Sequence, residues 1–348
     1  MDKLNLEKLW KDSENIINQK HLLIVCNTKT TNLIGQGAFN LNSEYFSDDE
    51  FEEIVAMFSS IGIPIDFFTY EDDFFKYILK LKKSETSNIV VYNAAQSGYG
   101  AGRKSLIPAF CNLHNLNYTG SNAYVVALCR QKFHVNKILS ELGVQVPKTW
   151  LYSNGWLLNK TPLVGTKILL KPIYESASIG INSDSIKIYE PKIDKYIREL
   201  EKNQNQPIIA QEFISGYEVE VPLIRVGNTM HTFNPVGISI DGVYNLKDGF
   251  LDYGRIYFDE YEFYDFNEKF KKTILLKECV NNVSFALGME GLSRIDFRIQ
   301  SDGTFYLTDV STNPHFVSHS SVNFAFDLLK LTPNHIAKTI IASAIMKG

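Results

Sequence analysis

Residues 167–180 read KILLKPIYESASIG, an apolar run that ends in Lys171 and is followed by Pro172 and a loop of small residues. The apolar run predicts a buried strand, and the small residues after it predict a turn. A lysine at this place can meet phosphate oxygens together with the N–H groups of the loop, which suits a nucleotide phosphate. The alternative from the residues alone is a strand-end lysine that extends past a turn into solvent.

The chain around this segment alternates between strand and helix patterns. Strand patterns occupy residues 207–213, 218–224 and 231–236, and helix patterns occupy 131–143, 191–202, 267–287 and 332–346. Apolar residues recur there with the periods that distinguish the two structures. A second unit, rich in strands, is therefore expected to follow the helix at 131–143.

Strand patterns at 293–300 and 304–310 are joined by a short turn that contains Gly303, which predicts a hairpin. Residues two apart on a strand share a face, so Arg294 and Asp296 point the same way, and Asp309 lies opposite them. Two carboxylates of this kind suit Mg²⁺, with Arg294 available to a developing negative charge. A structural ion pair at the edge of a sheet is the alternative.

The N-terminal part of the chain has strand patterns at 21–26, 64–68 and 88–93 that alternate with helix patterns such as 48–58. This alternation predicts an α/β unit with a parallel, doubly wound sheet up to about Gly120.

A glycine-rich turn at 98–105 in this N-terminal unit lacks the glycine that a phosphate-binding GxxxxGK[ST] loop needs at Arg103. We expect instead that Arg103 and Lys104 face an anionic group of a substrate.

Composition limits the classes of function that remain. The chain has 348 residues, 35 Lys and Arg, and 39 Asp and Glu, so its net charge of −4 argues against a dedicated nucleic-acid binder. Its apolar runs are shorter than a membrane span, its start lacks the features of a signal peptide, and its four cysteines form no CxxC pair. We expect a cytoplasmic protein of two or three domains that acts on small molecules, with neither nucleic acid nor membrane as a partner.

Four segments, in this order, resemble motifs of the ATP-grasp superfamily, specifically those of D-alanine–D-alanine ligase and related carboxylate–amine ligases. They are Asn117–Ser121 with Lys132, Leu170–Pro172 with Ser178–Ile181, Glu212–Glu218, and Ser293–Phe297. The likeness covers most of the chain from about Val90. It implies an ATP-grasp fold with an N-terminal Rossmann-like domain at 1–122, a central ATP-grasp subdomain at 123–213 and a C-terminal catalytic subdomain at 214–348.

Transferred residue by residue, the resemblance implies roles for individual side chains. The implied ATP contacts are Lys132, Lys171, Ser178, Gln211, Glu212, Phe213, Ile214 and Glu218. The implied ligands of Mg²⁺ are Asp296, Asp309 and Ser311. Arg294 would stabilise the oxyanion formed when an amine attacks an acyl phosphate, and Arg255 would replace a lysine of the family's lid. Ser320 and Ser321 would hold the carboxylate of the second substrate.

Several positions depart from the family's motifs. Asp309 and Ser311 stand where the family has a glutamate and an asparagine that bind metal, and Asn313 is a less favoured substitute for the asparagine. Ala177 replaces a serine of the phosphate loop. The first-substrate segment at 96–103 and the loop at 26–46 lack the family's residues, so recognition of a D-alanine amino group is not expected to carry over.

These observations support an ATP- and Mg²⁺-dependent carboxylate–amine ligase that acts through an acyl phosphate on substrates other than two D-alanines. The family resemblance also suggests a homodimer. Two alternatives remain, a true D-alanine–D-alanine ligase and a nucleotide-binding scaffold whose catalysis is weakened at Asp309 and Ser311.

Overall fold

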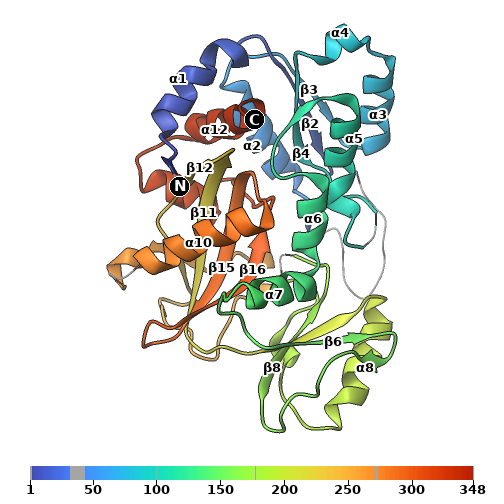
Figure 1. Cartoon of the computed structure of the whole chain (residues 1–348), viewed down its shortest axis with the longest axis vertical. Helices are drawn as coiled ribbons and strands as arrows, with labels where there is room; N and C mark the ends of the chain where they lie inside the picture. The colour runs from blue at the N-terminus through green and yellow to red at the C-terminus, as the bar shows by residue number, and fades with distance from the viewer. Residues whose placement is uncertain (1, 32–43, 99, 177, 271–272, 348) are drawn as a thin grey trace.

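The computed structural model describes residues 2–31, 44–98, 100–176, 178–270 and 273–347. Their strands form three sheets, and helices cover the sheets and connect them (Figure 1). The expected mixed α/β class is confirmed. No helix within these ranges is both long enough and apolar enough to cross a membrane.

The first sheet is parallel and has the order β3-β2-β4-β5. Its strands are β2 (His21–Cys26), β3 (Ile65–Phe68), β4 (Ile89–Ala94) and β5 (Asn117–Tyr118). The helices α2 (Asp48–Ser59), α3 (Glu71–Lys80), α4 (Lys83–Thr86) and α5 (Leu106–His114) connect them. Five of the six side chains of β2 are buried, as expected of a central strand in a parallel sheet. The predicted doubly wound unit is therefore present.

The second sheet is antiparallel and has the order β7-β6-β10-β8-β9. Its strands are β6 (Thr149–Ser153), β7 (Trp156–Leu157), β8 (Lys167–Pro172), β9 (Ile186–Ile188) and β10 (Ile208–Glu212). Helix α8 (Ile193–Gln204) packs its buried Ile197 against Tyr152 and Ile168 of this sheet. Helices α6 (Ala123–Arg130) and α7 (Lys132–Glu141) lead into it from the first sheet.

The third sheet is the largest. It contains β1 (Asp2–Lys3), β11 (Tyr217–Val226), β12 (Thr229–Thr232), β13 (Val236–Ser239), β14 (Glu262–Asp265), β15 (Gly291–Ile299) and β16 (Phe305–Ser311). Its associated helices are α9 (Tyr253–Tyr257), α10 (Ile274–Leu287), α11 (Ser321–Asp327) and α12 (Pro333–Ile345). The predicted hairpin is β15–β16, and the predicted last helix is α12, which begins after the capping residue Thr332.

Two predicted elements were wrong in extent. The single strand expected at 231–236 is split into β12 and β13, because Pro235 has no N–H to give to a strand ladder. The helix expected from residue 267 begins only at Ile274, since Asp265 ends strand β14 and its side chain caps a short 3₁₀ turn at Phe266–Glu268.

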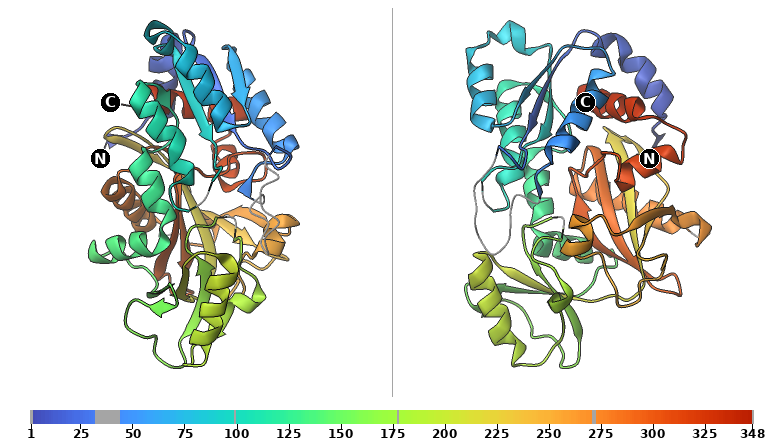
Figure 2. Two further views of the ribbon diagram at one scale, coloured as in Figure 1. Left: turned by 90° about the vertical axis from the view of Figure 1, so that its right-hand side faces the viewer. Right: turned by 180° about the vertical axis from the view of Figure 1, so that it is seen from behind.

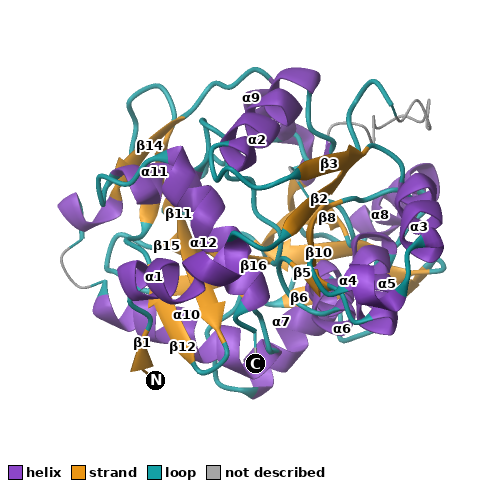
Figure 3. Ribbon diagram, turned by 90° about the horizontal axis from the view of Figure 1, so that it is seen from above, coloured by secondary structure: helices purple, strands orange, loops and turns teal. Residues whose placement is uncertain are grey.

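The N-terminal residues join the third sheet rather than the first. Strand β1 pairs in parallel with β12, and helix α1 (Leu6–Ile17) packs on α12, where Trp10 donates a 2.8 Å hydrogen bond to Thr339. Figures 1 and 3 show α1 and α12 side by side. The largest apolar core runs through this region and joins residues of β2, α2, β11, α11 and α12.

The second sheet lies at the opposite end of the molecule from α1 and α12 (Figure 2). Between these ends, Arg103 of the loop after β4 contacts Glu175 of the loop after β8, and Asn313 after β16 contacts Asn93 of β4. The division of the chain into domains at residues 122 and 213 remains our proposal.

Candidate active site

Two lysines from different elements lie around Asp309. Lys171, near the end of β8, donates a 2.9 Å hydrogen bond from Nζ to Oε1 of Gln211 on β10. Lys132, the first residue of α7, donates from Nζ to the carbonyl of Glu175 at 2.6 Å and lies 3.8 Å from Oδ2 of Asp309. Burial lowers the pKa of Lys171, and Asp309 opposes that shift. The predicted phosphate lysines and one predicted metal ligand are thus brought together.

The loop after β8 is bound to the segment that carries Arg255. Ser178 has a left-handed φ of 51°, and its hydroxyl donates a 2.9 Å hydrogen bond to the carbonyl of Leu251. The Tyr253 N–H donates to the carbonyl of Ile181 at 3.2 Å. Ala177, where the sequence departs from the family's serine, lies outside the described residues.

Arg255 itself lies on the short helix α9, whose first turn is capped by Asp252. Its guanidinium Nη1 is 3.6 Å from Oδ2 of Asp241, a residue in the turn after β13. A catalytic role for Arg255 stays a prediction.

Glu218 is held by a buried arginine that sequence reasoning missed. Arg298 Nη1 donates to Oε2 of Glu218 at 3.2 Å, and the same oxygen accepts the N–H of Leu251 at 3.1 Å. Arg298 also donates to the carbonyl of Ile214 at 2.9 Å and lies over the ring of Phe213. The pattern could have revealed it, because Arg298 follows Asp296 by two positions and therefore shares its face.

The predicted ATP-binding residues from Gln211 to Glu218 lie where the chain passes from β10 of the second sheet to β11 of the third. Gln211 and Glu212 end strand β10, and the N–H of Phe213 donates to the carbonyl of Lys167 at 2.9 Å. Arg298 links Ile214 to Glu218 across this connection. The implied adenine and ribose contacts are therefore neighbours in space, and their roles stay predictions.

Three carboxylates form a row across the third sheet. Asp296 on β15 is the Cα partner of both Glu220 on β11 and Asp309 on β16. Arg294 forms two hydrogen bonds of 2.8 and 2.9 Å with Asp296, and its Nη1 is 2.8 Å from Oε2 of Glu220. Ser311, the weak metal position, is the Cα partner of Arg294.

Burial shifts the pKa values of the ionisable groups in this row. It raises the pKa of Asp296 and raises that of Glu220 to about 7, in each case against the attraction of Arg294. Burial opposes the charge on Arg294 too, but Asp296 and Glu220 outweigh it and raise the pKa of the guanidinium. Sequence reasoning missed Glu220, although it lies two positions after Glu218 on the same strand.

The residues fit a magnesium ion that is completed by phosphate. Within the described parts of the chain, no group of three or more His, Cys, Asp and Glu side chains could hold a metal alone. Mg²⁺ commonly takes one or two carboxylates and fills its remaining positions with phosphate oxygens and water. The facing pair Asp296 and Asp309, beside two lysines, is of that kind.

The predicted second-substrate serines lie at the start of α11. The Ser320 hydroxyl caps this helix by accepting the N–H of Asn323 at 3.1 Å. Ser321 is fully buried and faces Glu220, whose pKa its hydroxyl lowers against the effect of burial. These positions therefore border the row of Glu220, Asp296 and Asp309 with its central Arg294, which we call the Arg294 row.

Arg103 and Lys104 both contact Glu44, a residue that no sequence motif singles out. Arg103 forms an ion pair with Glu44 and lies 3.4 Å from Glu175, and Lys104 Nζ is 3.3 Å from Oε2 of Glu44. Arg130, also missed, lies 3.4 Å from Oε1 of Glu44. The side chains of Glu44, Arg103 and Arg130 are all at least nine-tenths buried.

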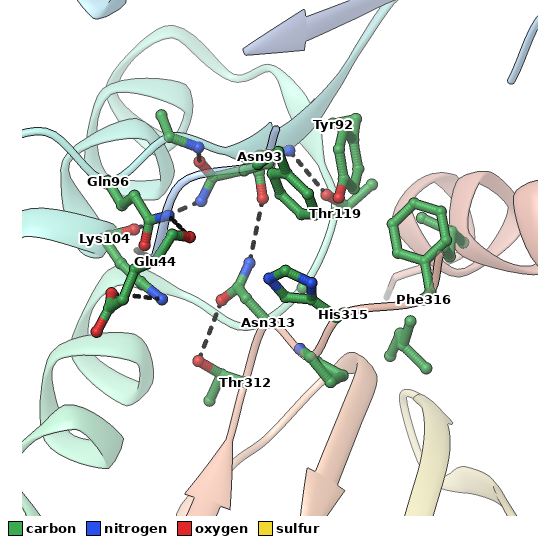
Figure 4. A pocket seen from close by; sticks show the side chains of 17 residues that line it. Glu44, Tyr92, Asn93, Gln96, Lys104, Thr119, Thr312, Asn313, His315 and Phe316 are labelled. Atoms are coloured by element: carbon green, nitrogen blue, oxygen red, sulfur yellow. Dashed lines mark hydrogen bonds and ion pairs between the residues drawn. The ribbon is translucent and has the colours of Figure 1, made fainter. Parts of the chain in front are cut away.

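A cavity that opens to solvent lies beside this cluster (Figure 4). Glu44, Gln96 and Lys104 form its charged and polar end, and Tyr92 and Phe316 are part of its apolar wall. Thr312 and Asn313, which directly follow Ser311, line it as well. The side-chain amide of Asn313 donates to the carbonyl of Asn93 at 3.2 Å, so this candidate second-metal residue is engaged across the cavity.

The sequence is similar to proteins of one known family. The family model described as D-ala D-ala ligase C-terminus matches residues 143–342. The D-alanine–D-alanine ligase of Bordetella petrii is 24% identical over 251 residues, 71% of this chain and 73% of that protein. The corresponding ligase of Neisseria gonorrhoeae is 27% identical over 228 residues, 64% of this chain and 69% of that one.

A solved structure has the same fold. It is the D-alanine–D-alanine ligase of Bacillus anthracis complexed with ATP, which aligns with a TM-score of 0.68 and 14% identity over 94% of this chain and 97% of that one. With the match of residues 143–342, the chain belongs to the D-alanine–D-alanine ligase family, a family of ATP-grasp enzymes that form carbon–nitrogen bonds with ATP.

Proposed function

We propose that the protein is an ATP- and Mg²⁺-dependent ligase that joins a carboxylate to an amine through an acyl phosphate. The observation that carries the proposal is the convergence of Lys132 and Lys171 on Asp309, which faces Asp296 and its partner Arg294. These groups come from helix α7 and from strands of two sheets, and their charges match a nucleoside triphosphate and its metal. The names of the relatives support the same reaction type.

The lysines would hold the phosphates of ATP. Lys132 and Lys171 both reach the space next to Asp309, where they can offset phosphate charge during transfer. Glu218 would accept hydrogen bonds from the ribose hydroxyls, and residues 211–214 would line the adenine. Mg²⁺ bound by Asp296 and Asp309 would neutralise further charge on the transferred phosphoryl group.

The reaction has two steps. A carboxylate oxygen of the first substrate attacks the γ-phosphorus of ATP, and ADP leaves. The amine nitrogen of the second substrate then bonds to the acyl carbon, the bond from that carbon to the phosphate oxygen breaks, and inorganic phosphate leaves as the amine loses a proton. Arg294 would stabilise the oxyanion of the intermediate between these events, because Asp296 and Glu220 hold its guanidinium in place.

We propose that the substrates are not two D-alanines. Residues 96–103 and 26–46 depart from the family's first-substrate motifs, and Glu44 in that region is already covered by cations. D-alanine–D-alanine ligation is the second candidate, since the curated relatives carry that name. A homodimer is a further expectation, which light scattering of the purified protein tests.

The test is ADP formation by the purified protein with Mg·ATP and pairs drawn from amino acids and other carboxylic acids. We expect ADP release that depends on both substrates and is lost in Lys171→Ala. If a broad panel gives no ADP although ATP binds, the ligase proposal is rejected, and a nucleotide-binding scaffold replaces it. A rate highest with two D-alanines would instead select the second candidate.

A further inference from the structure

The cavity beside Glu44 has an unusual charge pattern for a site that takes an amino acid. Among the described residues that line it, Glu44 is the one carboxylate. Each of its oxygens already meets two donors: Arg103 and Lys104 lie at Oε2, and Arg130 and the Ser176 N–H lie at Oε1. No oxygen of Glu44 is left for a substrate ammonium.

The surrounding cluster carries excess positive charge. Three cations, Arg103, Lys104 and Arg130, share two carboxylates. All three lie near Glu44, and both arginines also lie near Glu175. Burial lowers the pKa of Lys104 to about 8, although Glu44 opposes the shift. A further ammonium placed here would therefore be repelled in surroundings that screen charge weakly.

A second feature of the same wall points to a hydrogen-bond donor on the ligand. Gln96 is 3% exposed, and its Nε2 donates to the backbone carbonyl of Glu44, which fixes the orientation of the amide. The other end, Oε1, is buried without a hydrogen-bond partner in the described structure. Such a group is costly unless a ligand or water satisfies it.

Lys104 and Gln96 therefore present a donor and an acceptor to the same end of the cavity, and both are bound to Glu44 (Figure 4). A hydroxyl can accept from Lys104 and donate to Gln96. An acylated amine can do the same with its carbonyl and its N–H. The opposite wall, which includes Tyr92 and Phe316, suits an apolar side chain.

The position of the cavity connects it to the reaction. Thr312 and Asn313 line it and directly follow Ser311, which is the Cα partner of Arg294. A carboxylate at that end of the cavity would lie toward the Arg294 row, with its neighbouring polar group toward Gln96 and Lys104.

We propose that the first substrate is a carboxylic acid that carries a hydroxyl or acylated amine, rather than an ammonium, beside its reacting carboxylate, together with an apolar side chain. This inference rests on the proposed ligase function and names the substrate class of that site.

The experiment uses hydroxylamine as the amine, so that only the first substrate varies. Purified protein with Mg·ATP and hydroxylamine is offered alanine, lactate and N-acetylalanine, and leucine, 2-hydroxy-4-methylpentanoate and N-acetylleucine, each as both enantiomers. ADP and the hydroxamate product are measured. We expect kcat/KM to be at least tenfold higher for a hydroxy or N-acetyl acid than for the amino acid with the same side chain.

A higher kcat/KM for the amino acids overturns the substrate class while leaving the ligase function in place. Absence of hydroxamate and ADP with every acid rejects both proposals together.

Lys104→Met provides an independent measurement, because it removes the charge and keeps the length of the side chain. We expect it to lower kcat/KM for the preferred acid at least tenfold and to reduce the discrimination against the amino acid, with the KM for ATP unchanged. Lys83→Met, at an exposed position on α4, is the matched control. Unchanged discrimination in Lys104→Met would contradict the assigned role of this wall.

Discussion

Asp296 and Asp309 face each other across strands β15 and β16, directly before the point where the pairing shifts by one residue. The shift lies at Thr308, whose hydroxyl donates to the carbonyl of Asp296 at 3.1 Å. An irregularity of this kind redirects the side chains beside it. Here it leaves Asp309 near Lys132 of α7 while Asp296 stays with Arg294.

Asp309→Asn should therefore weaken the response to magnesium more than the binding of ATP. Removing one of two carboxylates lowers the charge that holds a hard cation. We expect the Mg²⁺ concentration for half-maximal ADP formation to rise roughly 10-fold or more, on the scale of a lost charge-assisted interaction of about 1.5–3 kcal/mol. Asp72→Asn, exposed on α3, is the control and should behave as wild type. An unchanged magnesium response in Asp309→Asn would remove this residue from the metal site.

Lys171→Ala should reduce ATP affinity directly. The lysine is half-buried near the end of β8, and Gln211 is the one hydrogen-bond partner that the described structure gives its Nζ. Loss of a charged donor to a phosphate costs about 1.5–3 kcal/mol, so we expect the dissociation constant of Mg·ATP to rise roughly 10- to 100-fold. Titration calorimetry measures it, with Lys83→Ala as the exposed control. Equal affinities in the two variants would argue against phosphate contact.

The strands and the carboxylate pair could be predicted because their signals are local. Period-2 patterns and the turn at Ser301–Gly303 are enough to bring Asp309 into the neighbourhood of Asp296. An unbroken hairpin register would pair Asp296 with Thr308, so the direct pairing with Asp309 depends on the irregularity at Thr308, which no sequence pattern indicates. The Glu44 cluster could not be predicted in the same way. Glu44 is 59 positions from Arg103 and 86 from Arg130, and these distant parts of the chain meet only when the first sheet packs on its neighbours.

Local patterns failed where the tertiary structure decided the outcome. Pro235 interrupts what looks like one strand, and the polar segment before Ile274 forms a strand end and a 3₁₀ turn instead of the first turns of a helix. Glu220 and Arg298 were within reach of the alternation rule but carry no motif of their own.

Glu44→Gln should destabilise the fold, because it leaves three cations buried beside a neutral group. Breaking a buried pair by removing one partner costs about 3–5 kcal/mol, and the side chain of Glu44 is 1% exposed. Urea unfolding at pH 7 measures the difference from wild type. Glu52→Gln, exposed on α2, is the matched control and should be within about 0.5 kcal/mol of wild type.

The stability difference between wild type and Glu44→Gln should also depend on pH. Burial would raise the pKa of Glu44, but Lys104, Arg130 and Arg103 outweigh it and hold the pKa well below the ordinary value of 4.5. A carboxyl whose pKa is lowered by folding stabilises the protein fully above its unfolded pKa, and loses that contribution as the pH falls toward the folded pKa. The stability difference between wild type and Glu44→Gln should be constant between about pH 5 and pH 7, below the range in which Lys104 loses its charge, and should shrink below 4.5. A difference that is the same at pH 3.5 and pH 7 would contradict this assignment.

Gly216→Ala should disturb the ATP segment through the backbone. Gly216 has a φ of 147°, and a Cβ there would lie 2.0 Å from the carbonyl oxygen of Ile299 on β15. That oxygen belongs to a strand and cannot move away cheaply, so the connection between Phe213 and Glu218 must shift. We expect a loss of about 3 kcal/mol of unfolding free energy, from overpacking and backbone strain, together with a higher KM for ATP. Gly227→Ala is the matched control, because Gly227 also has a left-handed φ, of 56°, but a Cβ there meets nothing within 4 Å. Equal losses of stability in the two variants would show that φ alone, and not contact with β15, determines the requirement for glycine at this position.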